Sequence, residues 1–344
     1  MLRSLEFYQQ LPKVDLHRHL EGSLRVRTLL EVGRSHGIDL LGTSFLRPLV
    51  QVREDEPATS QNFLSKFENL RRFYRSPQVI GRITLEAIAD AAEDNVRYLE
   101  LRFTPVALSK AENFSLAEVM DWVIEGAHQG ESQFGVLTRL IISVNRHESV
   151  DLAAQVIHLA VERMDKGIVG VDLAGNEAHF PAAPFIGVFK EARQAGLQVT
   201  IHAGEWGGAG NIAAAIVQFG AERIGHGVRV MEDPSVVALA RERGTTFEVC
   251  LTSNCQTGAV PSLYEHPMPH MLAAGLGITL NTDDPSVSRI TLSDEYRAAC
   301  EQLGFSLSVL RECVLRAAQA SFLPEAEKLR LIQSIKRDFP YRVD

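Results

Sequence analysis

Histidines and carboxylates recur in short groups along this chain, and the first group holds two histidines two residues apart. His17 and His19 lie within residues 14–22, where apolar and polar residues alternate as in a β-strand that opens into a loop. Side chains two residues apart on a strand share a face, so both imidazoles point the same way. Two imidazoles at one strand end could form half of a metal site. Within this segment alone, two unrelated histidines, one structural and one exposed, are the alternative.

Four later groups of polar residues have the same arrangement, because each follows an apolar run with the pattern of a strand. A single strand-end histidine is more often a hydrogen-bonded structural residue than a ligand. Five strand ends that carry titratable or glycine residues indicate a shared site instead. The four groups are Gly175-Asn176-Glu177, His202-Ala203-Gly204-Glu205, His226-Gly227 and Asp283-Asp284-Pro285.

The elements that must position these groups alternate regularly along the chain. A helical segment separates each predicted strand from the next, and no hairpin signal joins two strands, which favours a (β/α)8 TIM barrel formed by residues 1–344 as a single domain. A doubly wound sheet of eight strands is the structural alternative. The strands are predicted within residues 14–22 and at residues 96–103, 136–144, 168–175, 197–203, 223–226, 245–251 and 277–281.

Extra helices are predicted at two places in the barrel. Residues 24–36 and 60–94 look helical after the first strand, and three more helices, at residues 293–303, 306–320 and 324–337, end the chain. The C-terminal ends of barrel strands meet on one face, where the active sites of such folds lie. All five polar groups fall at this face.

Composition narrows the class of protein. The chain has 344 residues, 45% of them hydrophobic, without an apolar run near the roughly 18 residues of a membrane span or a secretion signal at its start, so we expect no membrane association and a cytoplasmic location. Its net charge is −8, with no basic block, which argues against a nucleic-acid partner. The four cysteines lack C-x-x-C pairs and are expected to be small buried residues. The oligomeric state is not indicated.

Three of the histidines and one carboxylate could hold a single metal ion at the top of the barrel. His17, His19, His202 and Asp283 would supply three nitrogens and one oxygen, a shell that suits zinc with a water completing it. Zinc lowers the pKa of its water to roughly 7, so that hydroxide is available at neutral pH. Glu205, His226 and Asp284 would then be free for proton transfer.

The ordered set of motifs resembles the adenosine deaminase family over nearly the whole chain. A lone H-x-H is common among metal-dependent hydrolases, but the set in this order is specific. The matching segments are DLHRHLEGSLR at residues 15–25, DLAGNE at 172–177, HAGE at 202–205, GHG at 225–227, LTSN at 251–254 and NTDDP at 281–285.

This resemblance implies roles for the individual residues. One Zn²⁺ per chain would be bound by His17, His19, His202 and Asp283. Glu205 would protonate N1 of a purine, so that C6 becomes electrophilic while the activated water attacks it, and this requires a raised pKa in a dry pocket. His226 and Asp284 would orient that water and manage its proton. The backbone of Gly175 would lie against the purine N3 edge. Phe63, Leu64 and Phe67 match a mobile lid, with ordinary helix packing as the alternative.

The expected substrate is a small purine nucleoside, and one position qualifies this. The resemblance favours hydrolysis of adenosine and 2′-deoxyadenosine to inosine or deoxyinosine and ammonia, as in purine salvage. Familiar adenosine deaminases carry an aspartate for the ribose 5′-hydroxyl where this chain has Glu21, which is more typical of adenine and aminodeoxyfutalosine deaminases, so both remain alternatives. A negative Glu21 should also repel a 5′-phosphate. Trp206 after the HAGE motif is a further departure.

Two functions of other classes remain as alternatives. A binuclear metallohydrolase of esters, amides or lactones would share the H-x-H motif, but such sites usually carry a bridging lysine after strand four, which residues 172–176 lack. A non-catalytic barrel that binds a purine or a protein partner would not need Glu205 and Asp284 beside a full ligand set. The H-x-E and P-C-x-x-C motifs of cytidine-deaminase zinc sites are absent.

Overall fold

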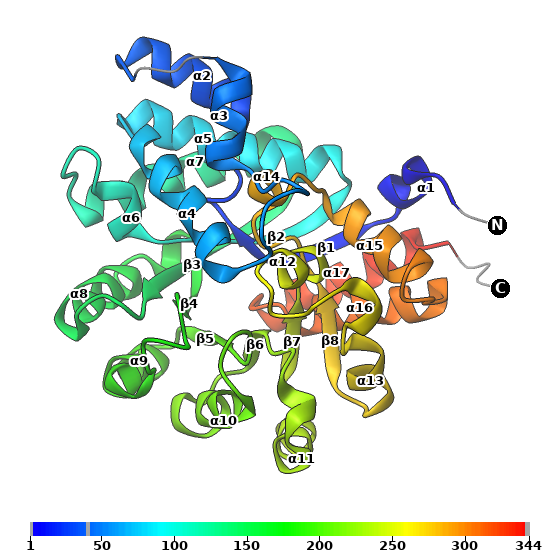
Figure 1. The fold of residues 1–344 in the computed structure, drawn as a ribbon. Helices are drawn as coiled ribbons and strands as arrows, with labels where there is room; N and C mark the ends of the chain where they lie inside the picture. The colour runs from blue at the N-terminus through cyan, green and yellow to red at the C-terminus, as the bar shows by residue number, and fades with distance from the viewer. Residues whose placement is uncertain (1–2, 39–41, 341–344) are drawn as a thin grey trace.

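The computed structural model describes residues 3–38 and 42–340, and eight parallel strands form one sheet in this part of the chain (Figure 1). Each strand pairs with the next in sequence order, as the alternation of strands and helices predicts. The strands are β1 (Lys13–His19), β2 (Val96–Phe103), β3 (Leu137–Asn145), β4 (Ile168–Ala174), β5 (Gln198–Ala203), β6 (Arg223–His226), β7 (Thr246–Val249) and β8 (Gly277–Leu280).

Hydrogen bonds between β1 and the segment that follows β8 close the barrel. The backbone N–H of Asp283 donates to the carbonyl of His17 at 2.7 Å, and the N–H of His19 donates to the carbonyl of Asp283 at 2.8 Å. Deeper in the barrel, the side-chain oxygen of Asn281 accepts the N–H of Leu16 at 3.0 Å. The predicted (β/α)8 barrel is therefore confirmed, and the doubly wound alternative is wrong because it would leave these strands apart at opposite positions of an open sheet.

Helices between consecutive strands surround the barrel (Figure 1). Two of their N-termini, those of α7 and α8, are capped by serine oxygens that accept otherwise unpaired N–H groups, Ser115 from Glu118 and Ser149 from Leu152. Their apolar faces cover the strands, which are almost entirely buried. The helices are α7 (Leu116–Phe134), α8 (Val150–Val161), α9 (Ile186–Gln194), α10 (Ala209–Ala214), α11 (Pro234–Arg243) and α13 (Met268–Ala273).

The segment between β1 and β2 differs from its prediction. Residues 60–94 form two helices instead of one, separated by a 3₁₀ turn at Arg71–Phe73. Ser76 is extended (φ −161°, ψ 162°) and caps the second helix, because the following Pro77 disfavours a helical conformation in the residue before it. The helices of this segment are α2 (Val26–Ser35), α3 (Thr43–Val50), α4 (Ser60–Leu70) and α5 (Pro77–Glu93), of which α3 was not predicted.

The remaining helices complete the shell. Three predicted C-terminal helices are present as α15 (Leu292–Glu301), α16 (Leu307–Ala320) and α17 (Glu325–Asp338), and α16 contacts β8 and β1. Four short helices were not predicted: α1 (Leu5–Gln10), α6 (Pro105–Ser109), α12 (Leu251–Gln256) and α14 (Pro285–Ser288). The predicted seventh strand ends earlier, at Val249, since the chain turns there into α12. None of the described helices is long and apolar enough to span a bilayer.

Candidate active site

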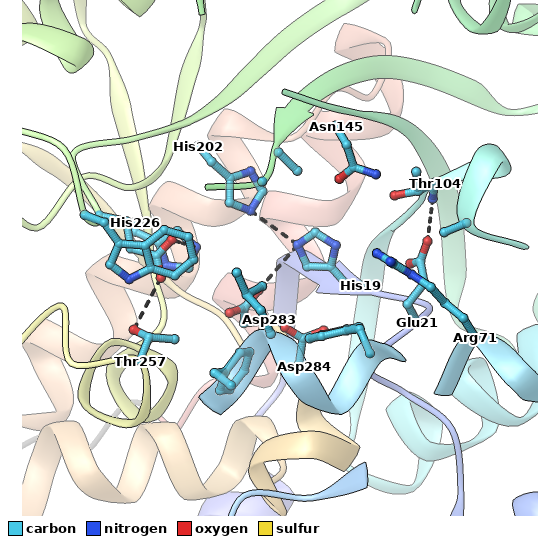
Figure 2. Close-up of a pocket in the computed structure, with 18 residues that line it drawn as sticks. His19, Glu21, Arg71, Thr104, Asn145, His202, His226, Thr257, Asp283 and Asp284 are labelled. Carbon is cyan, nitrogen blue, oxygen red and sulfur yellow. Dashed lines mark hydrogen bonds and ion pairs between the residues drawn. The ribbon is translucent and has the colours of Figure 1, made fainter. Parts of the chain in front are cut away.

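A pocket at the C-terminal ends of the strands gathers most of the predicted site residues (Figure 2). It contains about 670 Å³ of empty space, part of which is open to solvent. His17 does not line it but lies fully buried against His202 and His226. The predicted site residues that line the pocket are His19, Glu21, Phe63, Leu64, Phe67, Gly175, His202, Glu205, His226, Asp283 and Asp284.

Buried carboxylates hold two of the histidines in a defined orientation. Nδ1 of His17 lies 2.7 Å from a carboxylate oxygen of Glu248, and Nδ1 of His202 lies 2.9 Å from Asp172. A nitrogen that faces a carboxylate at this distance carries the proton and donates it, which leaves the lone pair on Nε2. Such carboxylate–histidine pairs are the usual outer support of metal-ligating histidines.

The free ring nitrogens then converge on one carboxylate. Nε2 of His17 is 3.2 Å from Oδ1 of Asp283, and Nε2 of His19 is 3.4 Å from the same oxygen and 3.3 Å from Nε2 of His202. Nε2 of His17 is buried and has no hydrogen-bond partner among the described residues, and its lone pair faces a carboxylate oxygen that repels it. A cation between these atoms would remove that repulsion, so the donor set fits a metal ion.

The fourth histidine of the cluster, His226, is distinguished by the hydrogen bonds behind it. Ligand atoms of His17, His202, His226 and Asp283 all lie within 4.8 Å of one another, so distance alone admits His226 as a ligand. Its Nδ1, however, contacts the side-chain nitrogen of Asn254 at 3.1 Å. Asn254 also contacts His266, and that contact decides which of the two groups donates.

A backbone N–H fixes the direction of these bonds. The N–H of Met268 donates to Nδ1 of His266 at 3.1 Å, and burial lowers the pKa of His266 to about 4, so the ring is neutral with its proton on Nε2. That proton is donated to the Asn254 oxygen at 3.3 Å. The Asn254 nitrogen therefore donates to Nδ1 of His226, whose own proton lies on Nε2. A protonated nitrogen is a hydrogen-bond donor and does not bind a metal.

Glu205 lies next to this donor and is buried. Burial, together with the charges of Asp283 and Glu177, raises the pKa of Glu205 well above its usual value. One carboxyl oxygen lies 3.6 Å from Nε2 of His226, and the other accepts the hydroxyl of Thr257 at 3.4 Å. A carboxyl group that keeps its proton at neutral pH can act as a general acid.

Glu177 shapes the loop that carries Glu205. Its carboxylate accepts four consecutive backbone N–H groups, those of residues 204–207, at 2.6–3.0 Å, and the amide of Asn211 at 2.9 Å. Backbone N–H groups that converge in this way form an anion-binding nest. The sequence placed Glu177 at a strand end but gave it no role, because a nest depends on backbone directions that no residue type specifies.

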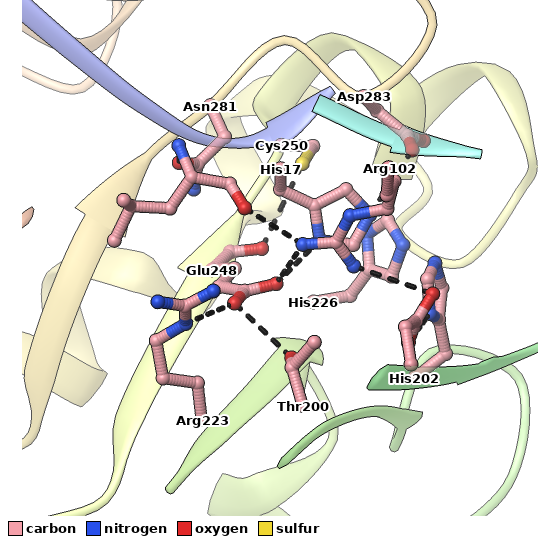
Figure 3. Close-up of polar contacts among 12 residues, drawn as sticks. His17, Arg102, Thr200, His202, Arg223, His226, Glu248, Cys250, Asn281 and Asp283 are labelled. Atoms are coloured by element: carbon pink, nitrogen blue, oxygen red, sulfur yellow. Dashed lines mark hydrogen bonds and ion pairs between the residues drawn. The ribbon is translucent and has the colours of Figure 1, made fainter. Parts of the chain in front are cut away.

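The floor of the site rests on a charged network inside the barrel (Figure 3). Glu248 accepts Nη2 of Arg102 at 2.8 Å and Nε of Arg223 at 2.6 Å. Burial alone would raise the pKa of Glu248, but these two guanidinium groups hold it well below its usual value. The carboxylate behind His17 is thus permanently ionised, which strengthens its hydrogen bond to the ring.

Two further contacts restrict the paired aspartates. The hydroxyl of Ser253 donates to Oδ2 of Asp283 at 2.6 Å, which leaves Oδ1 to face the histidines. Oδ1 of Asp284 is buried, and no residue within 3–38 and 42–340 gives it a hydrogen bond. A Cβ at Gly22 would lie 1.9 Å from that oxygen, so this position admits no larger residue. Asp283 itself adopts a left-handed conformation (φ 62°), an uncommon one for a residue other than glycine.

The other end of the pocket is formed by Glu21 and its neighbours. One Glu21 oxygen accepts the N–H of Thr104 at 2.6 Å, and the other is buried without a hydrogen-bond partner in the part of the chain that the structure describes. Burial raises the pKa of Glu21 to about 7. Figure 2 shows Glu21, Thr104 and Arg71 together, on the opposite side from His226. Arg71 was not predicted as a site residue, because it lies in a turn within a stretch that looked continuously helical.

The remaining predicted residues provide shape. Phe63 is buried, Leu64 and Phe67 are partly buried, and all three face the pocket from α4. Whether they form a mobile lid or pack as an ordinary helix face stays an open prediction. Gly175 follows β4 with φ 95°, a conformation that glycine adopts readily and that leaves this wall free of a side chain. Trp206 also lines the pocket, and its buried indole nitrogen makes no hydrogen bond to any described residue.

The sequence of this chain is similar to those of one known protein family. A sequence model of the family described as adenosine deaminase matches residues 12–338. An adenosine deaminase of Erwinia tasmaniensis is 39% identical over 321 residues, which is 93% of this chain and 96% of that protein. An adenosine deaminase of Klebsiella pneumoniae is 38% identical over 329 residues, or 95% of this chain and 98% of that protein.

Solved structures share the whole fold. A Burkholderia ambifaria amidohydrolase with bound Zn has a TM-score of 0.90 and 26% identity, and the match covers 97% of this chain and 92% of that one. Adenine deaminase of Arthrobacter aurescens has a TM-score of 0.86 and 29% identity, covering 95% and 98%. Arabidopsis ADAL, complexed with GMP, has a TM-score of 0.87 and 29% identity, covering 98% and 100%.

Proposed function

The chain belongs to the adenosine deaminase family, and from that premise we propose that it hydrolyses adenosine and 2′-deoxyadenosine to inosine and deoxyinosine with release of ammonia. The observation that supports this most is the meeting of two features in one pocket. Ring nitrogens aimed at Asp283 can hold a metal ion, and the buried Glu205 beside them keeps a proton that it can donate.

The proposed metal is one zinc ion per chain, held by Nε2 of His17, His19 and His202 and by Asp283. Its bound form would supply hydroxide at neutral pH by lowering the pKa of water from 15.7 to roughly 7. A solved relative of this fold contains bound Zn, which favours this ion over others. No lysine follows β4, which ends at Ala174, so nothing at this position could bridge a second ion.

Three residues would transfer protons or orient the attacking water. Glu205 donates its proton to N1 of the purine, which draws electrons from C6 and makes that carbon electrophilic. The Nε2–H of His226 orients the attacking water by donating to its oxygen, in agreement with the tautomer that Asn254 imposes. Asp284, whose Oδ1 has no hydrogen-bond partner among the described residues, accepts one proton from the water and passes it to the departing amine, which leaves as ammonia. The second proton of the water is released when the C6 hydroxyl becomes a carbonyl, and it replaces the proton that Glu205 gave to N1.

The rest of the pocket would select the substrate. The free wall at Gly175 lets the N3 edge of the base approach the backbone. Glu21, which has one unpaired oxygen, is placed to accept a hydrogen bond from a sugar hydroxyl. Phe63, Leu64 and Phe67 of α4 would cover the bound base and exclude water from it.

Deamination of another 6-aminopurine is the second candidate. Glu21 stands in place of the shorter aspartate typical of adenosine deaminases, and a solved adenine deaminase is 29% identical to this chain. Adenine has no sugar, so its turnover would leave the unpaired Glu21 oxygen unsatisfied, which costs about 1–3 kcal/mol for a buried polar group.

A side-by-side assay of ammonia release separates these candidates. The substrates are adenosine, 2′-deoxyadenosine, adenine, AMP and aminodeoxyfutalosine at equal concentration. We expect the largest kcat/KM for the two simple nucleosides. A larger value for adenine or aminodeoxyfutalosine would instead establish the second candidate.

A further inference from the structure

The loop that carries Glu205 is held by hydrogen bonds to its neighbours. It covers residues 204–208, between β5 and α10, and belongs to neither element. On one side, the backbone N–H of Arg229, which follows β6, donates to the carbonyl of Gly204 at 3.0 Å. The side chain of Arg229 donates to the carbonyl of Trp206, also at 3.0 Å. These bonds hold the carbonyl side of the loop.

The N–H side of the loop meets the carboxylate of Glu177. Oε1 accepts the N–H groups of residues 205–207 at 2.6–2.9 Å, and Oε2 accepts those of Gly204 at 3.0 Å and of the Asn211 amide at 2.9 Å. Five N–H groups on two oxygens favour the ionised carboxylate, which has only acceptor sites. A Cβ at Gly207 would lie 2.2 Å from Nδ2 of Asn211 and 3.0 Å from Oε2 of Glu177, so the loop closes tightly on this carboxylate.

Glu177 is itself held by a turn that follows β4. The side-chain oxygen of Asn176 accepts the N–H of Ala178 at 3.0 Å, and its carbonyl accepts the N–H of Phe180 at 3.1 Å. Gly175, which leaves one wall of the pocket free of a side chain, begins the same turn, two residues before Glu177. One buried side chain thus joins the loop of the proposed proton donor to the loop that forms this wall.

We propose that Glu177 is a positioning residue, whose carboxylate fixes the place of Glu205 relative to the wall at Gly175. The proposal rests on the proposed deaminase function, under which these two groups meet N1 and N3 on one edge of a rigid base. The distance between them must then match that edge. A misplacement of about 1 Å in such an arrangement can lower the rate on the order of 10²-fold.

The charge of Glu177 acts on the same proton donor. Burial, then the charge of Asp283 and then that of Glu177, raises the pKa of Glu205. Deamination needs the protonated form of Glu205, so kcat/KM falls as the pH rises through this pKa. Loss of the charge of Glu177 would lower the pKa and move this alkaline limb to lower pH. The other groups that contact Glu205, or whose charges interact with it or with Glu177, are His226, Thr257, Asp284 and Arg146.

Two substitutions separate the charge of Glu177 from its length. Glu177→Gln keeps the length but replaces one acceptor oxygen with a donor, which then faces N–H groups. We expect its kcat for adenosine to fall about 10- to 100-fold and its alkaline limb to move about one pH unit lower. Glu177→Asp keeps the charge and should have the wild-type limb, although its shorter side chain displaces the loop and lowers kcat.

Glu222→Gln is the matched control. The carboxylate of Glu222 accepts the N–H of Val199 at 2.9 Å, at the opposite end of β5 from the pocket. This variant removes the same charge and a hydrogen bond to the same strand, so its kcat and pH profile should match the wild type. An unmoved limb in Glu177→Gln, or the same shift in Glu177→Asp, would overturn the proposal. If Glu177→Gln does not fold, an undiminished kcat in Glu177→Asp would overturn it.

The proposed function and the role of Glu177 can fail separately. If no 6-aminopurine nucleoside is deaminated, the function is wrong, and titration of Glu205 in the zinc-bound protein still tests the role of Glu177 without a substrate. The ¹³C chemical shift of the Glu205 carboxyl group, assigned with Glu205→Gln, reports its pKa. A lower pKa in Glu177→Gln than in the wild type and in Glu177→Asp would support the role. Equal pKa values in all three would refute it.

Discussion

Glu205 and Glu21 show how two equally buried carboxyl groups in one pocket acquire different roles. Both are about 5% exposed or less, and burial raises the pKa of each. Glu205 faces a hydroxyl and the imidazole of His226, without a cation, and remains protonated. Glu21 accepts a backbone N–H, which limits the rise in its pKa to about 7. Under the proposed function, a proton donor therefore lies at the end of the pocket that takes the base, and an acceptor lies at the end that takes the sugar.

The first prediction concerns the proton that Glu205 donates. Glu205→Gln should lower kcat for adenosine about 10²- to 10⁴-fold, the usual contribution of a general acid, because an amide cannot protonate N1. Zinc content by elemental analysis and inosine binding should stay near wild type. A turnover rate within a few-fold of wild type would remove Glu205 from its proposed role.

The second prediction concerns the tautomer of His226. Asn254→Asp is isosteric, but its carboxylate accepts hydrogen bonds from both neighbouring imidazoles and would move the His226 proton to Nδ1. The donor aimed at the attacking water is then lost, so kcat should fall about 10- to 100-fold while KM changes little. Imidazole ¹⁵N chemical shifts should show the proton of His226 on Nε2 in the wild type and on Nδ1 in the variant.

Gln256→Glu is the matched control for that substitution. It adds the same charge to the same helix, α12, at a side chain that contacts the carbonyl of Ser288 and no histidine. Its ¹⁵N spectrum and kcat should match wild type. An unchanged His226 spectrum in Asn254→Asp would contradict the assigned tautomer.

The predictability of the site differs from residue to residue. The positions of His17, His19, His202 and Asp283 follow from strand-end motifs, because parallel strands bring the same ends together. The hydrogen bonds that lead from Met268 through His266 and Asn254 to His226 cannot be predicted from motifs. They depend on which ring nitrogen meets which donor. Sequence patterns specify residue types and faces, but not the direction of a hydrogen bond.

At the scale of elements, local backbone chemistry decides where the sequence prediction succeeds. Regular helices such as α7 and α8 agree with their apolar periodicity and serine caps. The stretch 60–94 has the same periodicity throughout, and the break before Pro77 creates the turn that carries Arg71. Short helices such as α12 lie below the length at which periodicity is informative. The turn contributes Arg71 to the pocket and the short helix α6 contributes Ala107, and the sequence predicted neither of them.

The third prediction concerns the junction of α15 with α12. Glu295 is fully buried and accepts the N–H of Thr252 at 3.2 Å, and burial raises its pKa to about 7. The carboxyl group of Glu295 thus binds its proton more tightly in the folded protein than in the unfolded chain, where its pKa is 4.5. The contribution of Glu295 to stability is greatest below pH 4.5 and is lost as the pH rises through 7.

Glu295→Gln removes this dependence, because glutamine stays neutral. The free energy of unfolding of the wild type, relative to that of the variant, should fall by on the order of 3 kcal/mol between pH 5 and pH 8, since one pKa unit corresponds to about 1.4 kcal/mol. Urea titrations at both pH values measure it. Glu242→Gln, at an exposed position of α11, should show no such trend. A difference that does not vary with pH would contradict the assigned pKa of Glu295.

At the scale of the whole molecule, barrel closure brings the site together. His17 and Asp283 lie at opposite ends of the chain, and the hydrogen bonds between β1 and the segment after β8 place them side by side. The alternation of strands and helices predicted this arrangement. It did not predict the charged interior around Glu248, because Arg102 and Arg223 in alternating strands resemble outward-facing residues in the sequence. Through Glu248, that interior supports the proposed metal ligand His17 from below.

Stepwise return of zinc to the metal-free enzyme tests the central claim most directly. The metal is removed by chelation, zinc is added in measured equivalents, and adenosine consumption is followed together with inosine and ammonia. We predict no turnover without metal, a linear rise up to one equivalent per chain and a plateau beyond it, with inosine and ammonia formed in equal amounts. Full activity in the metal-free enzyme, or a rise that continues to two equivalents, would contradict a deaminase built around one metal ion.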